Sequence, residues 1–351
     1  MNTLDKIIER IKPLDAAAMQ QAMQRQERLT KPRGSLGRLE ELSIQIAGIT
    51  AEPIPRLKSK AILTMAADHG VTAQGVSLYP AEVTRQMVLN FLEGGAAINV
   101  LSRMIGARVI IVDMGVRGGL PVSEGITLKS IAPGTKDMSI GPAMTHSQAM
   151  DCLLAGIEIV EHEIKNGLDI LGTGDMGIGN TTSAGAITAV ISGQAVSDVT
   201  GRGTGIDDQQ LAHKVKIIEQ SIAVNRPDAA DAIDVLAKVG GFEIGGLAGA
   251  MLAAAANHIP VVIDGFISGA AALIAAAICA QSRDYMIASH LSAEKGHAAC
   301  LRHLKLEPIL KLNLRLGEGT GAALGIFLAE SSVNLLREMA TFSEAGVSDI
   351  Q

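Results

Sequence analysis

Acidic and imidazole side chains follow five short apolar runs of this sequence. The runs cover residues 61–66, 109–113, 168–171, 261–264 and 285–288, and the residues that end or follow them include Asp68, His69, Asp113, Asp175, Asp264, Ser289 and His290. Short apolar runs are typical of strands buried on both faces of a parallel sheet. Because ligands bind at the carboxyl ends of such strands, we expect these side chains to converge on one site.

A glycine-rich segment over residues 172–179 matches the pattern GxGxxG and is expected as a turn between a strand and a helix. Glycines let the backbone approach a phosphate, and the free N–H groups of a following helix bind it. Asp175 lies inside the segment, where a carboxylate repels a pyrophosphate unless it points elsewhere. A tight turn that serves only strand–helix packing explains the same glycines.

Two further glycine-rich segments each carry one charged candidate. Residues 201–208 precede a helix that contains Lys214, which either binds a phosphate together with Gly203 or lies on a solvated helix face. Glu318 stands between Gly317 and Gly319, whose freedom permits a sharp turn that presents one carboxylate to a cleft. An ordinary helix start with a favourable acid is the alternative for Glu318.

Several classes of protein are excluded by composition and motifs. The net charge of −6, an aromatic content of 2% and the lack of tryptophan argue against a nucleic-acid partner. The eight histidines form no HExxH pair and no cluster has metal-ligand spacing, so we expect no metal. GxSxG and Walker A patterns are absent, which excludes the common hydrolases and P-loop enzymes.

The cellular location is predicted from the cysteines and the apolar segments. Cys152, Cys279 and Cys300 are widely spaced and odd in number, as expected for reduced thiols. The most apolar stretch, residues 265–280, is shorter than the roughly 20 residues that span a bilayer. The first residues form a charged amphipathic pattern with no signal-peptide core. We therefore expect a cytoplasmic protein without a membrane partner.

The elements that must position the candidate residues alternate along the chain. Residues 1–55 are predicted as helices, and a linker with two prolines over 51–56 follows. Helices are then expected over 83–103, 146–165, 207–224, 245–257, 266–281 and 321–342. Helices that alternate with short buried strands predict an α/β fold with a parallel sheet and helices on both faces. The last helix is expected to return to the N-terminal helices.

Five segments together resemble the nicotinate-nucleotide–dimethylbenzimidazole phosphoribosyltransferase family. They cover residues 31–40, 67–71, 172–182, 289–296 and 314–321, and they occur in the family's order over nearly the whole chain. The set is far more specific than any single motif. One departure is Asp175, where the family commonly has Glu, so that the carboxylate is one methylene shorter.

The resemblance implies a fold, an assembly and a site. It implies a Rossmann-like domain over residues 59–334, a small helical domain over 1–58 completed by 335–351, and a homodimer. Glu318 would be the catalytic base. The other implied site residues are Tyr79, Gln86 and Leu316 for the base, and Asp175, Gly177, Gly203, Lys214 and Ser292 for the phosphoribosyl and nicotinate groups.

The implied reaction transfers phosphoribose from nicotinate mononucleotide to 5,6-dimethylbenzimidazole, giving α-ribazole 5′-phosphate and nicotinate. The partners are then small-molecule substrates, and neither a cofactor nor a metal is required. Nicotinate leaves as a neutral ring, so no general acid is needed, whereas the attacking benzimidazole must lose a proton to a base. One buried carboxylate suffices for that step.

Two interpretations from other classes compete with this one. An NAD-dependent oxidoreductase would use Gly172 to Gly177 as its dinucleotide turn and needs an acid about 20 residues later, at the end of a second strand. Asp198 has roughly that spacing, but residues 195–198 are a poor strand. A non-catalytic nucleotide sensor would have the same sheet and leave Glu318 unexplained.

Overall fold

Six parallel strands form one sheet in the computed structural model, which describes residues 3–121 and 125–348. The strands are β1 (Lys60–Ala67), β2 (Arg108–Gly115), β3 (Ile126–Leu128), β4 (Ile170–Met176), β5 (Val261–Ile263) and β6 (Met286–Ala288). Their spatial order is β3-β2-β1-β4-β5-β6, and every neighbouring pair is parallel. This is the order of doubly wound nucleotide-binding sheets, so the predicted α/β fold is confirmed.

Helices make up most of the rest of the chain. They are α1 (Thr3–Arg10), α2 (Ala16–Arg28), α3 (Arg38–Thr50), α4 (Glu82–Leu92), α5 (Ala97–Ile105), α6 (His146–Lys165), α7 (Asn180–Ser192), α8 (Val196–Val199), α9 (Asp208–Asn225), α10 (Ala232–Val239), α11 (Phe242–Ala256), α12 (Phe266–Ile278), α13 (His297–Leu304), α14 (Thr320–Glu338) and α15 (Phe342–Ala345). Two short 3-10 segments are η1 (Gly70–Gln74) and η2 (Ala280–Tyr285). None of the helices within the described ranges is both long and apolar enough to span a bilayer.

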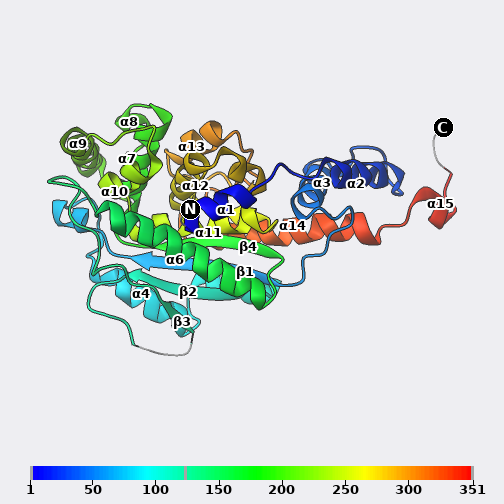
Figure 1. The fold of residues 1–351 in the computed structure, drawn as a ribbon, viewed down its shortest axis with the longest axis horizontal. Helices are drawn as coiled ribbons and strands as arrows, with labels where there is room; N and C mark the ends of the chain where they lie inside the picture. Colours follow the sequence, from blue (N-terminus) through cyan, green and yellow to red (C-terminus); the bar gives the residue numbers. More distant parts are fainter. Residues whose placement is uncertain (1–2, 122–124, 349–351) are drawn as a thin grey trace.

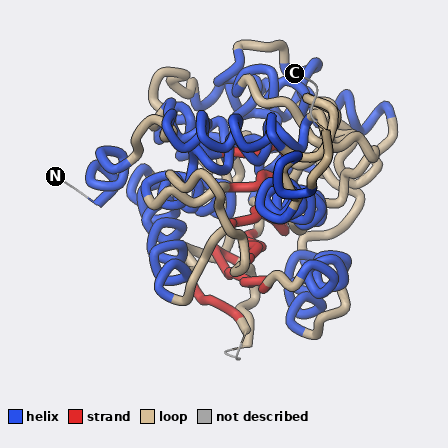
Figure 2. The backbone as a smooth tube through the Cα atoms, turned by 90° about the vertical axis from the view of Figure 1, so that its right-hand side faces the viewer, coloured by secondary structure: helices blue, strands red, loops and turns tan. Residues whose placement is uncertain are grey.

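The central strand β1 divides two apolar layers. All eight of its residues are buried, and successive side chains point to opposite faces of the sheet. Leu63 and Met65 pack into the layer that contains α6, α11 and α12. Ile62 and Ala66 pack into the layer that contains α4, α5 and α14. Figure 2 shows the strands between these two groups of helices. Burial on both faces explains the nearly continuous apolar run.

Helices α2 and α3 meet the end of α14 at one end of the molecule. Helices α2 and α3 pack on the C-terminal half of α14 (Figure 1), where Ala22, Ala47 and Leu336 form a small apolar cluster. Arg25 donates hydrogen bonds to the carbonyls of Leu336, at 2.6 Å, and of two further residues that end α14. Helix α1 contacts α11 and α6. The proposed domain boundaries remain a prediction, and their residues 1–2 and 349–351 lie outside the described residues.

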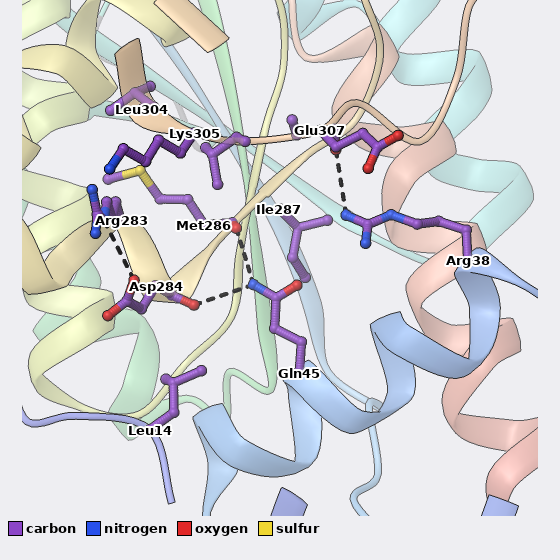
Figure 3. A pocket seen from close by; sticks show the side chains of 12 residues that line it. Leu14, Arg38, Gln45, Arg283, Asp284, Met286, Ile287, Leu304, Lys305 and Glu307 are labelled. Atoms are coloured by element: carbon purple, nitrogen blue, oxygen red, sulfur yellow. Dashed lines mark hydrogen bonds and ion pairs between the residues drawn. The ribbon is translucent and has the colours of Figure 1, made fainter. Parts of the chain in front are cut away.

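The edge strand β6 is covered by helix α3. Gln45 of α3 donates hydrogen bonds of 3.2 Å to the carbonyls of Asp284 and Met286 (Figure 3). Ile309 donates a further bond to the carbonyl of Ala288. A strand edge with unpaired carbonyls invites pairing with other chains, and these donors remove that hazard. The cavity beside Gln45, of about 490 Å³, contains none of the predicted site residues.

The sequence-based element boundaries need three corrections. The third strand runs over Ile170–Met176 and not over 168–171, so most of the expected turn belongs to β4. The helix expected over 83–103 is interrupted between α4 and α5, where Gly94 has a φ of 77° that a helix does not accommodate. Strand β3 was not predicted, because its three residues carry too short a pattern.

The terminal helices generate a stability prediction. Leu336→Ala should lower the free energy of unfolding by about 2–5 kcal/mol, because it opens a cavity at a fully buried position. Hydrogen exchange should show lost protection in α2 and α3 with β1 unchanged, if these helices unfold as a unit with the end of α14. Leu312→Ala, at a half-exposed position, is the control. Equal loss of protection in β1 would show that the chain has no separate helical unit.

Candidate active site

A cavity of about 760 Å³ opens at the carboxyl ends of β1 and β4, where the strand order reverses. Ligands of doubly wound sheets bind at this switch point. The cavity brings together six of the predicted site residues, namely Tyr79, Asp175, Gly177, Gly203, Leu316 and Glu318. Residues from four separate parts of the chain therefore surround one space.

Glu318 is presented to this cavity by an unusual backbone. Gly317, Glu318 and Gly319 have φ values of 84°, 65° and 97°, so three consecutive residues lie in the left-handed region. This conformation costs a residue with a Cβ about 1–2 kcal/mol, which the surrounding contacts must offset. Thr64 of β1 donates to the Glu318 carbonyl at 2.9 Å, and the Glu318 N–H donates to the Asp175 carbonyl at 3.2 Å. The loop is thereby bonded to both central strands.

Asp264, which follows β5, holds the end of the same loop and the start of α14. Its carboxylate accepts hydrogen bonds from the N–H groups of Gly319 at 3.1 Å, Gly321 at 2.7 Å and Ala322 at 3.0 Å. These groups have no partner within their own helix, and an acid at a helix start also interacts favourably with the helix dipole. Burial raises the pKa of Asp264 to about 7, although the three N–H groups oppose this.

The glycines of β4 have a packing role. A Cβ at Gly174 would lie 2.3 Å from the Glu318 carbonyl oxygen, and one at Gly172 would lie 2.9 Å from Ile62. Both positions let the Glu318 loop and α14 approach the strand closely. The prediction of a GxGxxG turn over these residues is therefore wrong, because only Gly177 and Gly179 lie in the turn before α7.

The Glu318 carboxylate is 4% exposed and lies at the start of helix α5. It accepts a long hydrogen bond of 3.4 Å from the Ile98 N–H. Burial raises the pKa of Glu318 above its ordinary value, and the bond from Ile98 lowers it by a smaller amount. A carboxylate with a raised pKa is a stronger proton acceptor than a solvated one, as a general base must be.

Asp175 ends β4 beside Glu318 and is also buried. Asn180 donates a hydrogen bond of 2.9 Å to one carboxylate oxygen, and the other has no partner among the described residues. Burial raises the pKa of Asp175 well above its ordinary value, and the negative charges of Asp264, Glu243 and Glu318 raise it further. Asp175 is thus more readily protonated than a solvated carboxylate.

Lys214 and Gly203 lie on the other side of the turn before α7. Lys214 is 1% exposed, and its ammonium donates a 2.6 Å hydrogen bond to Thr181 Oγ1, beside Gly203. Burial lowers the pKa of Lys214 to about 8, although the charge of Glu294 raises it. Thr181 and Gly203 line the cavity, so Lys214 lies directly behind its wall. The start of α7 and this ammonium together favour an anion.

Ser292 and Gln86 are placed outside the cavity lining. Ser292 is buried behind the wall, where its hydroxyl donates to the Leu314 carbonyl at 3.1 Å and accepts from the Glu294 N–H. Gln86 is exposed on α4 and lines a neighbouring cavity of about 440 Å³ together with Asp68 and Arg117. The structure therefore separates Gln86 from Tyr79, with which the resemblance groups it.

Sequence reasoning missed two charged residues of the cavity. Arg315 lines it and donates a 3.0 Å hydrogen bond to the Gly203 carbonyl. Glu294 is buried in the wall with one carboxylate oxygen unpaired. Both belong to segments that carry the family resemblance. Arg315 meets the glycine-rich segment around Gly203 only in the folded chain. The one sequence signal for Arg315 was therefore its nearness to Glu318.

Other polar strand ends do not reach this cavity. Asp113 accepts the N–H groups of Gly115 and Val116 and thereby closes the turn after β2. His290 is buried against Gly265 and Gly321 and is kept neutral, because burial lowers its pKa to about 4. In the part of the chain that the structure describes, no His, Cys, Asp and Glu side chains form a group that could hold a metal ion.

The oxidoreductase alternative is not supported. It requires an acid at the end of a second strand, whereas Asp198 lies in the short helix α8. The glycines that it would use for a dinucleotide turn lie mostly within β4. Both structural conditions for that interpretation fail.

Comparison with known proteins agrees with the geometry. A model of the phosphoribosyltransferase family matches residues 11–347. The nicotinate-nucleotide–dimethylbenzimidazole phosphoribosyltransferase of Desulforudis audaxviator is 58% identical, with 99% of each chain covered, and that of Chloroflexus aurantiacus is 56% identical with the same coverage. The crystal structure of the Thermus thermophilus enzyme of this name has a TM-score of 0.91 and 43% identity, over 96% of this chain and 100% of that one. The chain belongs to the nicotinate-nucleotide–dimethylbenzimidazole phosphoribosyltransferase family.

Proposed function

We propose that this chain transfers the phosphoribosyl group of nicotinate mononucleotide to 5,6-dimethylbenzimidazole, as the names of its relatives state for them. The observation that carries the proposal is the position of Glu318, a buried carboxylate with a raised pKa in a cavity that also has an anion-binding wall. The product would be α-ribazole 5′-phosphate, used in the assembly of cobalamin.

The chemistry requires a base on one side of the cavity and a phosphate site on the other. One benzimidazole nitrogen bonds to C1′ while the bond from C1′ to the pyridinium nitrogen breaks, and nicotinate leaves as a neutral ring. Glu318 accepts the proton from the other benzimidazole nitrogen. Attack opposite the leaving group inverts C1′, which converts a β-nucleotide into an α product.

The binding roles follow the two sides of the cavity. Tyr79 and Leu316 are more than half exposed at its rim and supply apolar surface for the benzimidazole. Gln86, which lines the neighbouring cavity, stays a proposed contact of the base. Gly177, Gly203, Lys214 and Ser292 belong to the wall that holds the 5′-phosphate. Asp175 lies between the two sides and, when ionised, stabilises the positive charge that develops at C1′.

A direct assay tests the whole proposal. Purified protein is mixed with nicotinate mononucleotide and 5,6-dimethylbenzimidazole, and released nicotinate is measured by chromatography. Release that requires both substrates supports the transferase. Nucleotide binding without release would indicate the sensor instead.

We infer that the protein is cytoplasmic and works as a homodimer. The three cysteines form no disulfide within the described residues, as is usual in a reducing compartment. Helices α5 and α14 contact each other and expose Val100, Met104 and Phe327, and we propose these side chains as the contact surface for a second copy of the chain.

The assembly has its own test. Phe327 is 54% exposed, so Phe327→Arg should fold normally yet place a charge in the proposed interface and dissociate the dimer. Sedimentation velocity should then give the mass of one chain in place of two. Arg337→Glu, farther along α14, is a control that should leave the mass unchanged. A dimer that persists in Phe327→Arg would exclude this surface.

Lys214→Ala should weaken the binding of nicotinate mononucleotide roughly tenfold to hundredfold, because a charge-assisted hydrogen bond contributes about 1.5–3 kcal/mol. The affinity for the benzimidazole should change little, and calorimetry can measure both. In the unmodified protein, nucleotide affinity should fall as the pH rises through about 8, where Lys214 loses its proton. Unchanged nucleotide binding in the variant would place Lys214 outside the site.

Glu318→Gln tests the base. Glutamine preserves size but cannot accept the proton, so the chemical step should slow by roughly 10²–10⁴-fold with little change in substrate binding. A base works only when it is deprotonated, so the rate should fall as the pH drops below the raised pKa of Glu318. This acidic limb should disappear in the variant.

Asp175→Asn is the control for that assignment. Loss of a carboxylate that only stabilises charge lowers the rate while the acidic limb that Glu318 causes remains. Near-normal turnover with an intact acidic limb in Glu318→Gln would transfer the role of base to Asp175.

A further inference from the structure

Three polar side chains form a buried chain beneath the turn that begins α7. His69 follows β1, Ser183 lies in the second turn of α7, and Glu243 lies in the first turn of α11. His69 Nδ1 is 3.2 Å from Ser183 Oγ, and His69 Nε2 is 2.7 Å from Glu243 Oε1. None of the three side chains is more than 1% exposed. They therefore connect three elements without contacting solvent.

The hydrogen-bond partners determine where the protons lie. Ser183 Oγ is 3.2 Å from the Gly240 carbonyl, which can only accept, and 3.9 Å from Met138 Sδ, and we assign the hydroxyl proton to the carbonyl. Ser183 then accepts a bond from His69 Nδ1–H. Glu243, in the first turn of α11, accepts from Nε2–H. On this assignment both ring nitrogens carry protons, and His69 is an imidazolium paired with Glu243.

The order Ser–His–Glu resembles the triad of a hydrolase, but these residues cannot act as one. A nucleophile needs access to a substrate, whereas Ser183 is buried and directs its proton to Gly240. The histidine of a triad must also be free to accept the serine proton, and His69 Nδ1 already holds one.

The imidazole ring instead supports the turn that lines the cavity. A Cβ at Gly177 would lie 3.3 Å from His69 Cδ2 and Nε2, and one at Gly179 would lie 3.5 Å from His69 Cβ. Both glycines line the cavity. On the other side of the turn, Thr84 accepts a 3.0 Å hydrogen bond from the Ile178 N–H. The turn is thereby fixed between His69 and α4.

We propose that His69, held as an imidazolium by Glu243 and Ser183, is a positioning residue that fixes the turn and the first turns of α7 for binding the nucleotide phosphate. The inference deepens the proposed function and rests on it for the identity of the nucleotide. His69 does not touch the substrate. It acts through Ser183 on α7 and through its ring on Gly177, and its positive charge lies beneath the wall that receives the anion.

The charged groups around His69 and Glu243 are consistent with an ion pair in which the two charges cancel. Burial raises the pKa of Asp175 and Cys152, and the charge of Glu243 raises both further. Burial also raises the pKa of Asp68, and His69 is the smallest of the effects that oppose this. An unpaired Glu243 would add a full negative charge near a cavity that must receive a phosphate. The imidazolium removes that obstacle.

A first experiment examines the protons directly. In protein labelled with ¹⁵N-histidine, the His69 ring should show two N–H signals, assigned by their loss in His69→Gln. Two protonated nitrogens confirm the imidazolium. One protonated nitrogen overturns it, and this result does not depend on catalytic activity or on the identity of the substrate.

A second experiment measures the consequence for binding. Glu243→Gln leaves the size unchanged but removes the counter-charge, so that His69 becomes neutral. The Kd for nicotinate mononucleotide, measured by calorimetry, should rise roughly tenfold or more, the fold-change of about one charge-assisted hydrogen bond. The Kd for 5,6-dimethylbenzimidazole should not change. Ser183→Ala should raise the nucleotide Kd by a smaller factor.

Matched controls separate positioning from stability. Glu163→Gln removes another buried acid of an ion pair, and Ser332→Ala removes another buried hydroxyl, both far from the turn. These variants should lower the Tm and leave the nucleotide Kd unchanged. An unchanged nucleotide Kd in both Glu243→Gln and Ser183→Ala would overturn the inference. Nicotinate release by the unmodified protein is assayed separately, so a failure of the proposed reaction is distinguished from a failure of this positioning role.

Discussion

The buried carboxylate of Asp264 is the interaction on which the candidate site depends. It binds the N–H groups that begin α14 and so fixes the loop that carries Glu318 against the central strands. The same helix ends among α2 and α3, where Leu336 is buried. One helix therefore connects the proposed catalytic base with the terminal helices. Without Asp264, the left-handed conformation of Glu318 would lack the bond that holds its neighbour Gly319.

The close approach of the Glu318 loop and α14 to the sheet also explains where two glycines must stand. Gly174 must lack a side chain because the Glu318 carbonyl lies where a Cβ would be, and Gly321 must lack one because His290 and Asp264 occupy that space. A sequence pattern cannot distinguish such packing glycines from phosphate-binding ones, since both allow a close approach. This is why the segment 172–179 was predicted as a turn when its first half is a strand. The distinction requires knowledge of which distant segment approaches.

Much of the architecture was nevertheless predictable. The buried strands have apolar runs that local periodicity detects, and α6 begins at the predicted residue, where Thr145 and Gln148 form a capping box. It ends at the predicted residue before Asn166 and Gly167, whose φ of 80° a helix does not accommodate. That Asp175 and Glu318 line one cavity could be predicted only from the parallel sheet and the family resemblance together. The direction of the Lys214 side chain into the protein was not, since the other lysine of α9, Lys216, is exposed and the sequence does not distinguish the two. Burial of an ammonium depends on tertiary packing alone.

The electrostatics of the cavity explain how one site can bind an anion beside several carboxylates. Asp175, Asp264 and Glu318 all have pKa values raised by burial, so the site carries less negative charge than their number implies. The phosphate wall lies at the start of α7, with the Lys214 ammonium behind it and Arg315 at Gly203. The proposed donor carries a pyridinium cation and a phosphate, and it fits this division when its positive ring faces the carboxylates and its phosphate meets the helix start. As the ring leaves, positive charge shifts to C1′ and then to the bound benzimidazole. In the proposed reaction Glu318 removes that charge as a proton, which couples formation of the new bond to the electrostatic preference of the site.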